Sequence, residues 1–256
     1  MLESGRSSGA ERTFALTYSF WPWRLITLLA PNFFGHPATG DYWGYANFWE
    51  DHAYVGVLPL LLMLVAGWRY FRGSAKPVEA PTTEESHHGQ PTAVGGQTYS
   101  PAYRQVIPFF AVLIPISLTL AMGWNTPIYL WVFDYVPGFG YFQAPARLLI
   151  WTTVAMAVLA GVGAHILPEQ EPYRPLWRRL LVAGLGVAIA ALIGTLLVTD
   201  RSRTFLVATF TLGLWLTLSI TWLLKQPEAG AAQPQVTVWH WTGLALAAAD
   251  LLLAAF

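Results

Sequence analysis

The sequence predicts an all-α, polytopic membrane helix bundle with about six transmembrane helices and further interfacial or re-entrant segments. Of its 256 residues, 55% are hydrophobic and only 11% are charged, whereas soluble domains carry about 25% charged residues. Its apolar stretches approach or exceed the roughly 20 residues of a spanning helix, and they do not alternate in polarity as strands do. Aromatic residues make up 15% of the chain, and such rings favour the membrane–water interface.

The predicted spans are the apolar stretches that lie between charged residues. In order they are Ala53–Trp68, Gln105–Gly123, Leu148–Pro168, Leu180–Thr199, Thr204–Leu224 and Val238–Phe256. Arg69 and Arg72 can snorkel to extend the first span, which is the shortest. Internal prolines predict a kink in the second span and a shallow or re-entrant segment after it, up to Phe133.

Other segments are not expected to cross the membrane. Trp21–Phe34 is apolar but short and contains Arg24, which favours an interfacial or re-entrant piece. Residues 73–103 are rich in Pro, Gly, Ser, Thr, Glu and His, as is typical of a flexible solvated loop. The short turn Thr199–Arg203 predicts an antiparallel hairpin of its flanking helices. We expect residues 1–256 to form a single membrane domain that includes this loop.

Lysine and arginine are distributed unevenly between alternate loops. Eight of them belong to one side (Arg69, Arg72, Lys76, Arg104, Arg174, Arg178, Arg179 and Lys225) and four to the other (Arg24, Arg147, Arg201 and Arg203). The positive-inside rule therefore places loop 73–103 in the cytoplasm, and segments 36–52 and 123–145 on the outer face. Because no signal peptide precedes the first span and the last helix runs to Phe256, we expect an internal piece of a longer protein.

Composition excludes several functional classes. The chain has no cysteine, which excludes disulfides, thiolate metal sites and cysteine nucleophiles. Its net charge of zero argues against a polybasic nucleic-acid binder, and we expect no nucleic-acid partner. His87 and His88, near Glu84 and Glu85, are the nearest approach to a metal site, but a flexible loop imposes no ligand geometry. No metal site is therefore predicted.

A first candidate site combines carboxylates, histidines and aromatic rings just before a span. Its residues are His36, Asp41, Tyr42, Trp43, Trp49, Glu50, Asp51 and His52. Carboxylates can act as bases or bind hydroxyl groups, and aromatic faces stack on sugar rings or hold lipid headgroups. The alternative is an aromatic belt with solvated charges at the membrane surface.

A second candidate site is the segment from Asp134 to Arg147. Arg147 is predicted at the outer N-terminal end of a span, where neither the positive-inside rule nor the helix dipole favours a cation. This position indicates a bound anion such as a phosphate, held together with helix N-terminal amides. The alternative is a salt bridge to Asp134 or Glu50.

Three features of the spans have structural interpretations. Asp250 lies about eleven residues into the last helix, where it is either functional or marks the far interface, and we favour the interface. His165 is expected to pack at the cytoplasmic end of its span. Small residues at four-residue spacing are expected to allow close helix packing: Ala157 with Gly161, and Gly186 with Ala190 and Gly194.

The two outer segments together carry a family resemblance. The strings LLAPNFFG, DYWG and YVGVLPLLL, followed by YVPGFGYFQAPARLLIWTTVAMAVLAGVG, resemble the bacterial YfhO-type membrane proteins. The resemblance covers Leu25–Met63 and Tyr129–Gly163 in detail and the other helices only in hydropathy. Within it, Glu50 matches the acidic position before Tyr-Val-Gly, and Arg147 matches the arginine of Pro-Ala-Arg. Asp250 is similar to the aspartate of a late Asp-Leu pair.

The resemblance implies a multi-pass protein of the bacterial cytoplasmic (inner) membrane, similar to GT-C glycosyltransferases. Such enzymes transfer sugars from polyprenyl-phosphate donors, outside the membrane, onto cell-envelope polymers or lipids. The implied partners are thus membrane lipids, a lipid-linked sugar donor and an envelope acceptor, and a divalent cation is left open as a cofactor. In that class an acidic residue of the first outer loop acts as base or metal partner. We expect that loop to lie upstream of Met1, so this piece is not expected to be active alone.

The resemblance also implies roles for individual residues. Arg147 would neutralise the phosphate that leaves as an acceptor hydroxyl attacks the sugar. The catalytic candidates are Glu50, Asp51 and Asp41, which would hold sugar or acceptor hydroxyls. The candidates for substrate binding are Tyr42, Trp43 and Trp49 as stacking surfaces, together with His52 and Gln143. Two alternatives stay open, a structural subunit of a membrane complex and a transporter of lipid-linked substrates, although the spans contain few polar residues for transport.

Overall fold

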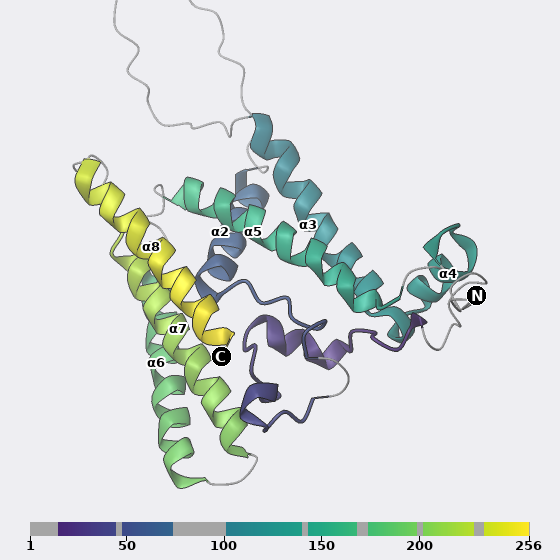
Figure 1. Cartoon of the computed structure of the whole chain (residues 1–256). Coiled ribbons are helices and arrows are strands. Elements are labelled where there is room, and N and C mark those ends of the chain that lie inside the picture. Colours follow the sequence, from purple (N-terminus) through teal and green to yellow (C-terminus); the bar gives the residue numbers. More distant parts are fainter. Residues whose placement is uncertain are drawn as a thin grey trace, which may run out of the picture.

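The computed structural model describes residues 15–44, 48–73, 101–139, 143–167, 174–198, 202–227 and 233–255. Within these residues the chain is all-helical and has no strand, as predicted (Figure 1). The 3-10 helices are η1 (Pro22–Leu28), η2 (Pro37–Thr39), η3 (Gly123–Asn125) and η5 (Pro145–Leu148). The α-helices are α2 (Val57–Gly73), α3 (Pro101–Ala121), α4 (Pro127–Tyr135), α5 (Leu149–Ile166), α6 (Arg174–Leu197), α7 (Ser202–Leu224) and α8 (Gln233–Ala254).

Four helical segments are long and apolar enough to cross a membrane, which indicates a multi-pass membrane protein. They are Pro145–Ile166, Pro175–Leu197, Arg203–Leu224 and Gln235–Ala254. The expected number of about six is not confirmed. The other two predicted spans form α2 and α3, whose described apolar stretches, Val57–Phe71 and Gln105–Ala121, are shorter than a full span.

Several helix boundaries differ from the predicted ones. Helices α6 and α8 begin at Arg174 and Gln233, several residues before the predicted spans, because a helix can continue through polar residues beyond its apolar part. Helix α3 begins at Pro101, inside the predicted loop 73–103, and residues 74–100 of that loop lie outside the described residues. The segment Trp21–Phe34 contains the seven-residue η1 and no spanning helix.

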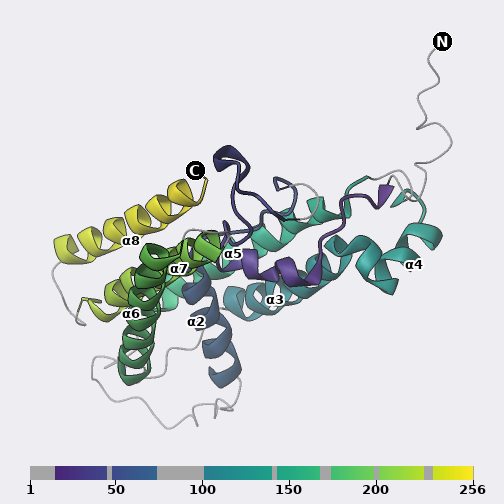
Figure 2. The ribbon, with the colours of Figure 1, turned by 90° about the horizontal axis from the view of Figure 1, so that it is seen from below.

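Helix α2 lies at the centre of the packing. It contacts α5 most extensively and also contacts α3, α7 and α8, so it joins the α3–α5 pair to the group formed by α6, α7 and α8 (Figures 1 and 2). The main hydrophobic core follows from this position, with Leu58 and Leu62 of α2, Leu159 of α5 and Ile220 of α7 among its buried members.

Helices α6 and α7 form the predicted antiparallel hairpin and pack closely along their length. The prediction of close helix contacts at small residues holds for Gly194, where an added Cβ would lie 3.1 Å from Leu206 of α7, but was wrong for the others. Ala157, Gly161, Gly186 and Ala190 are exposed. Other close approaches involve Gly163 of α5 against α2, Gly243 of α8 against Trp222 of α7, and Gly213 of α7 against Ala188 of α6. Each helix is rich in small residues on several faces, so their spacing alone does not identify the face that packs.

The N-terminal segments 15–44 and 48–56 lie across one end of the helices. The amide of Phe20 donates to the carbonyl of Ala121 at the end of α3 (2.9 Å), and the amide of Ala146 donates to the carbonyl of Tyr18 (3.0 Å). The hydroxyl of Thr204, at the start of α7, donates to Asp41 (2.9 Å). We name this end, which carries both candidate sites, the outer end after its predicted orientation. The opposite, inner end carries Arg69, Arg178, Arg179 and Lys225.

We expect Gly163→Ala to lower the thermal unfolding temperature, because a Cβ at this position would collide with the main-chain carbonyl of Leu62. Such overpacking typically costs about 1–3 kcal/mol. Gly161→Ala is a matched control two residues away, where a Cβ would meet nothing within 4 Å. It should keep or raise the unfolding temperature, since alanine favours helix by about 1 kcal/mol over glycine. Tryptophan fluorescence of the purified protein in detergent measures both, and equal effects would contradict the α2–α5 contact.

Candidate functional site

The first feature of the outer end is a buried ion pair between Arg24 and Asp51. The NH1 group of Arg24 donates to Asp51 Oδ2, and both side chains are only 3% exposed. Its NH2 group donates to the Tyr42 hydroxyl (2.8 Å), and its guanidinium lies 5.6 Å from the centre of the Phe34 ring. Arg24 thus joins η1, the loop at Tyr42 and the segment before α2. Sequence analysis did not assign it a role, although an arginine in an apolar, proline-containing segment is itself a signal of a buried partner.

Burial controls the titration of this ion pair. It raises the pKa of the Asp51 carboxyl to about 6, against the attraction of Arg24, while the neighbouring charge of Glu50 adds to the rise. Burial likewise raises the pKa of the Tyr42 hydroxyl and lowers the pKa of His52. At neutral pH Asp51 is therefore a carboxylate and His52 is a neutral ring.

The second feature is an exposed ion pair between Arg147 and Glu50. Both Nε and NH2 of Arg147 donate to Oε1 of Glu50, at 3.1 and 2.8 Å. The Arg147 side chain is 65% exposed and that of Glu50 is 16% exposed. Of the two alternatives for Arg147, the structure thus contains the salt bridge, with Glu50 and not with Asp134. The other carboxylate oxygen, Oε2, is buried and has no hydrogen-bond partner among the described residues.

Arg147 is positioned by an unusual turn. Ala144 adopts the left-handed conformation (φ +65°), which is strained for a residue with a side chain and atypical before a proline. Its amide donates to the carbonyl of Ala15 (3.0 Å), so the N-terminal segment holds the turn. Pro145 then begins η5, which places Arg147 at the N-terminal end of α5.

Asp41 is not part of either ion pair. Its carboxylate accepts hydrogen bonds from the amide of His36 (3.0 Å), from the Thr39 hydroxyl and from the Thr204 hydroxyl (2.9 Å). The hydrogen bond from Thr39, followed by that from His36, lowers the pKa of Asp41. This carboxylate therefore closes the turn 36–41 and ties it to α7.

The predicted aromatic residues pack around Phe48. Tyr42, Trp49 and His52 have ring centres 5.5, 5.2 and 4.6 Å from that of Phe48. Trp49 is nevertheless 68% exposed, and Trp43 is 48% exposed. Gln143, the remaining candidate, is half-buried. Exposed ring faces are thus present at the outer end, as stacking requires.

Asp250 lies near the outer end of α8, which begins at Gln233, as the favoured interpretation requires; its hydrogen bonds add a role that was not predicted. Its carboxylate accepts hydrogen bonds from the Tyr54 hydroxyl (2.7 Å) and from the amide of Val57 (2.8 Å). Val57 is the first residue of α2, so Asp250 caps that helix from a different helix. The partners are almost 200 residues apart in sequence, and no local pattern predicts such a contact.

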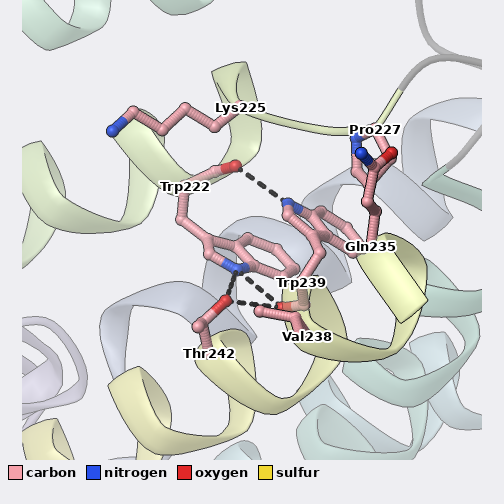
Figure 3. Close-up of a pocket in the computed structure, with 7 residues that line it drawn as sticks. All are labelled: Trp222, Lys225, Pro227, Gln235, Val238, Trp239 and Thr242. Atoms are coloured by element: carbon pink, nitrogen blue, oxygen red, sulfur yellow. Dashed lines mark hydrogen bonds between the residues drawn. The ribbon is translucent and has the colours of Figure 1, made fainter. Parts of the chain in front are cut away.

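An open pocket of about 550 Å³ lies at the inner end, between α7 and α8 (Figure 3). It is lined by Trp222, Lys225, Pro227, Gln235, Val238, Trp239 and Thr242. The indoles of Trp222 and Trp239 stack with ring centres 3.9 Å apart, and each donates to the main-chain carbonyl of the other. These contacts join α7 to α8.

The described residues contain no group of three His, Asp or Glu side chains placed to hold a metal ion. His87 and His88 lie outside the described residues. His165 is exposed near the inner end of α5. No residue that the structure describes is therefore assigned as a metal ligand.

Comparison with known proteins adds no assignment. No protein-family model, no curated protein and no solved structure matches this chain. The resemblance to the YfhO-type proteins accordingly stays a prediction from the sequence.

We expect Asp250→Asn and Tyr54→Phe each to lower the unfolding temperature, because each removes a hydrogen bond at the start of α2. Since the two groups bond directly, the double variant should be less destabilised than the sum, by about 0.5–3 kcal/mol. Thermal unfolding of all four proteins in one detergent measures this coupling. Additive effects would show that the two side chains do not interact.

The pH dependence of stability should report the buried ion pair. The pKa of Asp51 is raised in the folded state to about 6, so between about pH 4 and 6 the folded protein binds more protons than the unfolded one. This contribution to stability is complete below pH 4 and is lost as the pH rises through 6. The difference in unfolding temperature between wild type and Asp51→Asn should therefore shift in favour of the wild type as the pH falls from 7 to 4. A shift in the opposite direction would mean that Arg24 lowers this pKa.

Proposed function

We propose that this chain forms part of a membrane glycosyltransferase-like protein that takes sugars from polyprenyl-phosphate carriers at the outer membrane face. The observation that supports it is the exposed Arg147 at the N-terminal end of a candidate span, paired with the carboxylate of Glu50. A guanidinium there can bind the phosphate of a lipid whose chain lies along the span. The proposed acceptor is an envelope polymer or lipid, and the proposed location is the bacterial inner membrane.

The proposed reaction is a direct displacement at the anomeric carbon of the sugar. A bond forms between that carbon and the acceptor oxygen, while the bond to the phosphate oxygen breaks and its electron pair stays with the phosphate. Arg147 would stabilise the charge that develops on the leaving phosphate. Glu50, which contacts Arg147, is the carboxylate placed to take the acceptor proton or to hold a sugar hydroxyl.

Burial and hydrogen bonding suggest different roles for the other candidate site residues. Asp51 is 3% exposed and bound to Arg24, and Asp41 is bound within its own turn, so both are proposed as positioning residues. Tyr42 and His52 pack against Phe48 and belong to the same support. Trp43 and Trp49 keep exposed faces, and we retain them as stacking surfaces for a sugar.

A structural subunit of a membrane complex is the second candidate. It is favoured by the fact that Glu50 already neutralises Arg147, as a purely structural ion pair would. The two proposals differ in what Glu50 does. In a phosphate site it competes with the ligand for Arg147, whereas in a structural pair it only holds two segments together.

Binding of undecaprenyl phosphate to the purified protein distinguishes these proposals. Arg147→Gln should weaken binding by about tenfold or more, because it removes a charge-assisted hydrogen bond. Glu50→Gln should strengthen binding, since it frees Arg147 from a competing carboxylate. Native mass spectrometry across a range of lipid concentrations measures both.

The matched control is Arg203→Gln, which removes another exposed arginine at the outer end. It should leave binding unchanged within a factor of about two. Equal losses from Arg147→Gln and Arg203→Gln would reduce the effect to general surface charge. Weaker binding together with a lower unfolding temperature in Glu50→Gln would favour the structural subunit.

A further inference from the structure

Helix α4 is apolar but too short to cross a membrane. Its nine residues, Pro127–Tyr135, extend over roughly 13 Å. Thr126 begins the helix by accepting a hydrogen bond from the amide of Tyr129 (3.4 Å), and Pro127 occupies its first position. The helix is thus a defined element with its own start, placed between α3 and α5.

One face of α4 is apolar and uncovered. Ile128, Trp131 and Tyr135 are 55%, 61% and 70% exposed, and their spacing of three and four residues places them on the same side of the helix. Trp124, in the η3 turn just before, is 52% exposed. Tyr129 is 2% exposed and faces the protein. The uncovered side therefore points away from the protein to which α4 is attached.

The position of α4 along the spans is set by hydrogen bonds. Phe20 bonds to Ala121 at the end of α3, and Ala146 at the start of α5 bonds to Tyr18, so these two helix ends lie at one level. The Asn125 side chain donates to the carbonyl of Phe20 (3.1 Å), which holds the start of α4 at the same level. Figures 1 and 2 show α4 projecting beside these ends, away from α6, α7 and α8.

The first turn of α5, which lies at the same level, also exposes large apolar side chains. Ile150 and Trp151, in the first turn of α5, are 63% and 53% exposed and belong to a candidate span. A spanning helix faces lipid with such residues, and tryptophan and tyrosine concentrate at the depth of the headgroups. The exposed face of α4 thus lies at the level where a candidate span exposes the same kinds of side chain.

We propose that α4 is an interfacial helix whose face formed by Trp124, Ile128, Trp131 and Tyr135 lies in the outer lipid leaflet. The occupant of this face is the bilayer itself, at the boundary between headgroups and acyl chains. The helix anchors the segment between α3 and the turn that carries Arg147. The proposal rests on the membrane assignment of α5 and is independent of any transferase activity.

The absence of cysteine from the chain allows a direct test. Trp131→Cys in the full chain carries a single spin label after reconstitution into vesicles of phosphatidylcholine and phosphatidylglycerol. Power saturation then compares collisions of the label with oxygen, which concentrates in lipid, and with a water-soluble nickel chelate. Ala38→Cys, exposed in the outer turn, is the aqueous control, and Leu185→Cys, exposed midway along α6, is the lipid control.

We expect the label at position 131 to lie about 5–10 Å below the headgroup surface. Its nickel access should be several-fold lower than at position 38, and its oxygen access lower than at position 185. Nickel access equal to that at position 38 would place α4 in water and overturn the proposal. An immobile label shielded from both reagents would show that a protein partner covers this face. Ile128→Cys lies on the same face and gives the same test if Trp131→Cys does not reconstitute.

Discussion

The carboxylate of Asp250 fixes the start of α2, and the rest of the arrangement depends on that position. In apolar surroundings the first amides of a helix have no water to bond, so a buried helix start needs a partner from elsewhere in the chain. Asp250 supplies it from α8, together with a bond to Tyr54. Because α2 contacts α3, α5, α7 and α8, this one carboxylate fixes the central helix against the C-terminal helices. It also positions Glu50 and Asp51, which directly precede the capped segment.

Two arginines of the outer end, Arg24 and Arg147, are paired with carboxylates in different surroundings. Arg24 and Asp51 are each only 3% exposed, so water cannot replace either partner of this pair. Arg147 is mostly exposed, so water can solvate it when Glu50 leaves. The first pair can therefore only support the structure, whereas the second can exchange its partner while the fold stays intact.

The sequence predicted correctly those features that depend only on neighbouring residues. An apolar stretch must be helical and buried in lipid or protein, so the class, the α6–α7 hairpin and most helix positions follow from composition and turns. It did not predict the features that depend on contacts between residues far apart in the chain. Nothing near Asp250 points to Tyr54, and nothing near Gly163 distinguishes its face from that of Gly161. For Arg147 the sequence predicted either a bound phosphate or a salt bridge to Asp134 or Glu50. The structure identifies Glu50 as its partner.

The carboxylates of the outer end are bound in two ways, either by an arginine or by hydroxyl and amide donors. At the outer end Asp51 has Arg24, Asp250 has a hydroxyl and an amide, and Asp41 has two hydroxyls and an amide. Each of these carboxylates joins two segments of the chain through its bonds. The pair of Glu50 and Arg147 is exposed on one side and leaves one carboxylate oxygen without a partner among the described residues. Because that oxygen is buried whereas the Arg147 side chain is 65% exposed, the guanidinium is the group of this pair that solvent can reach.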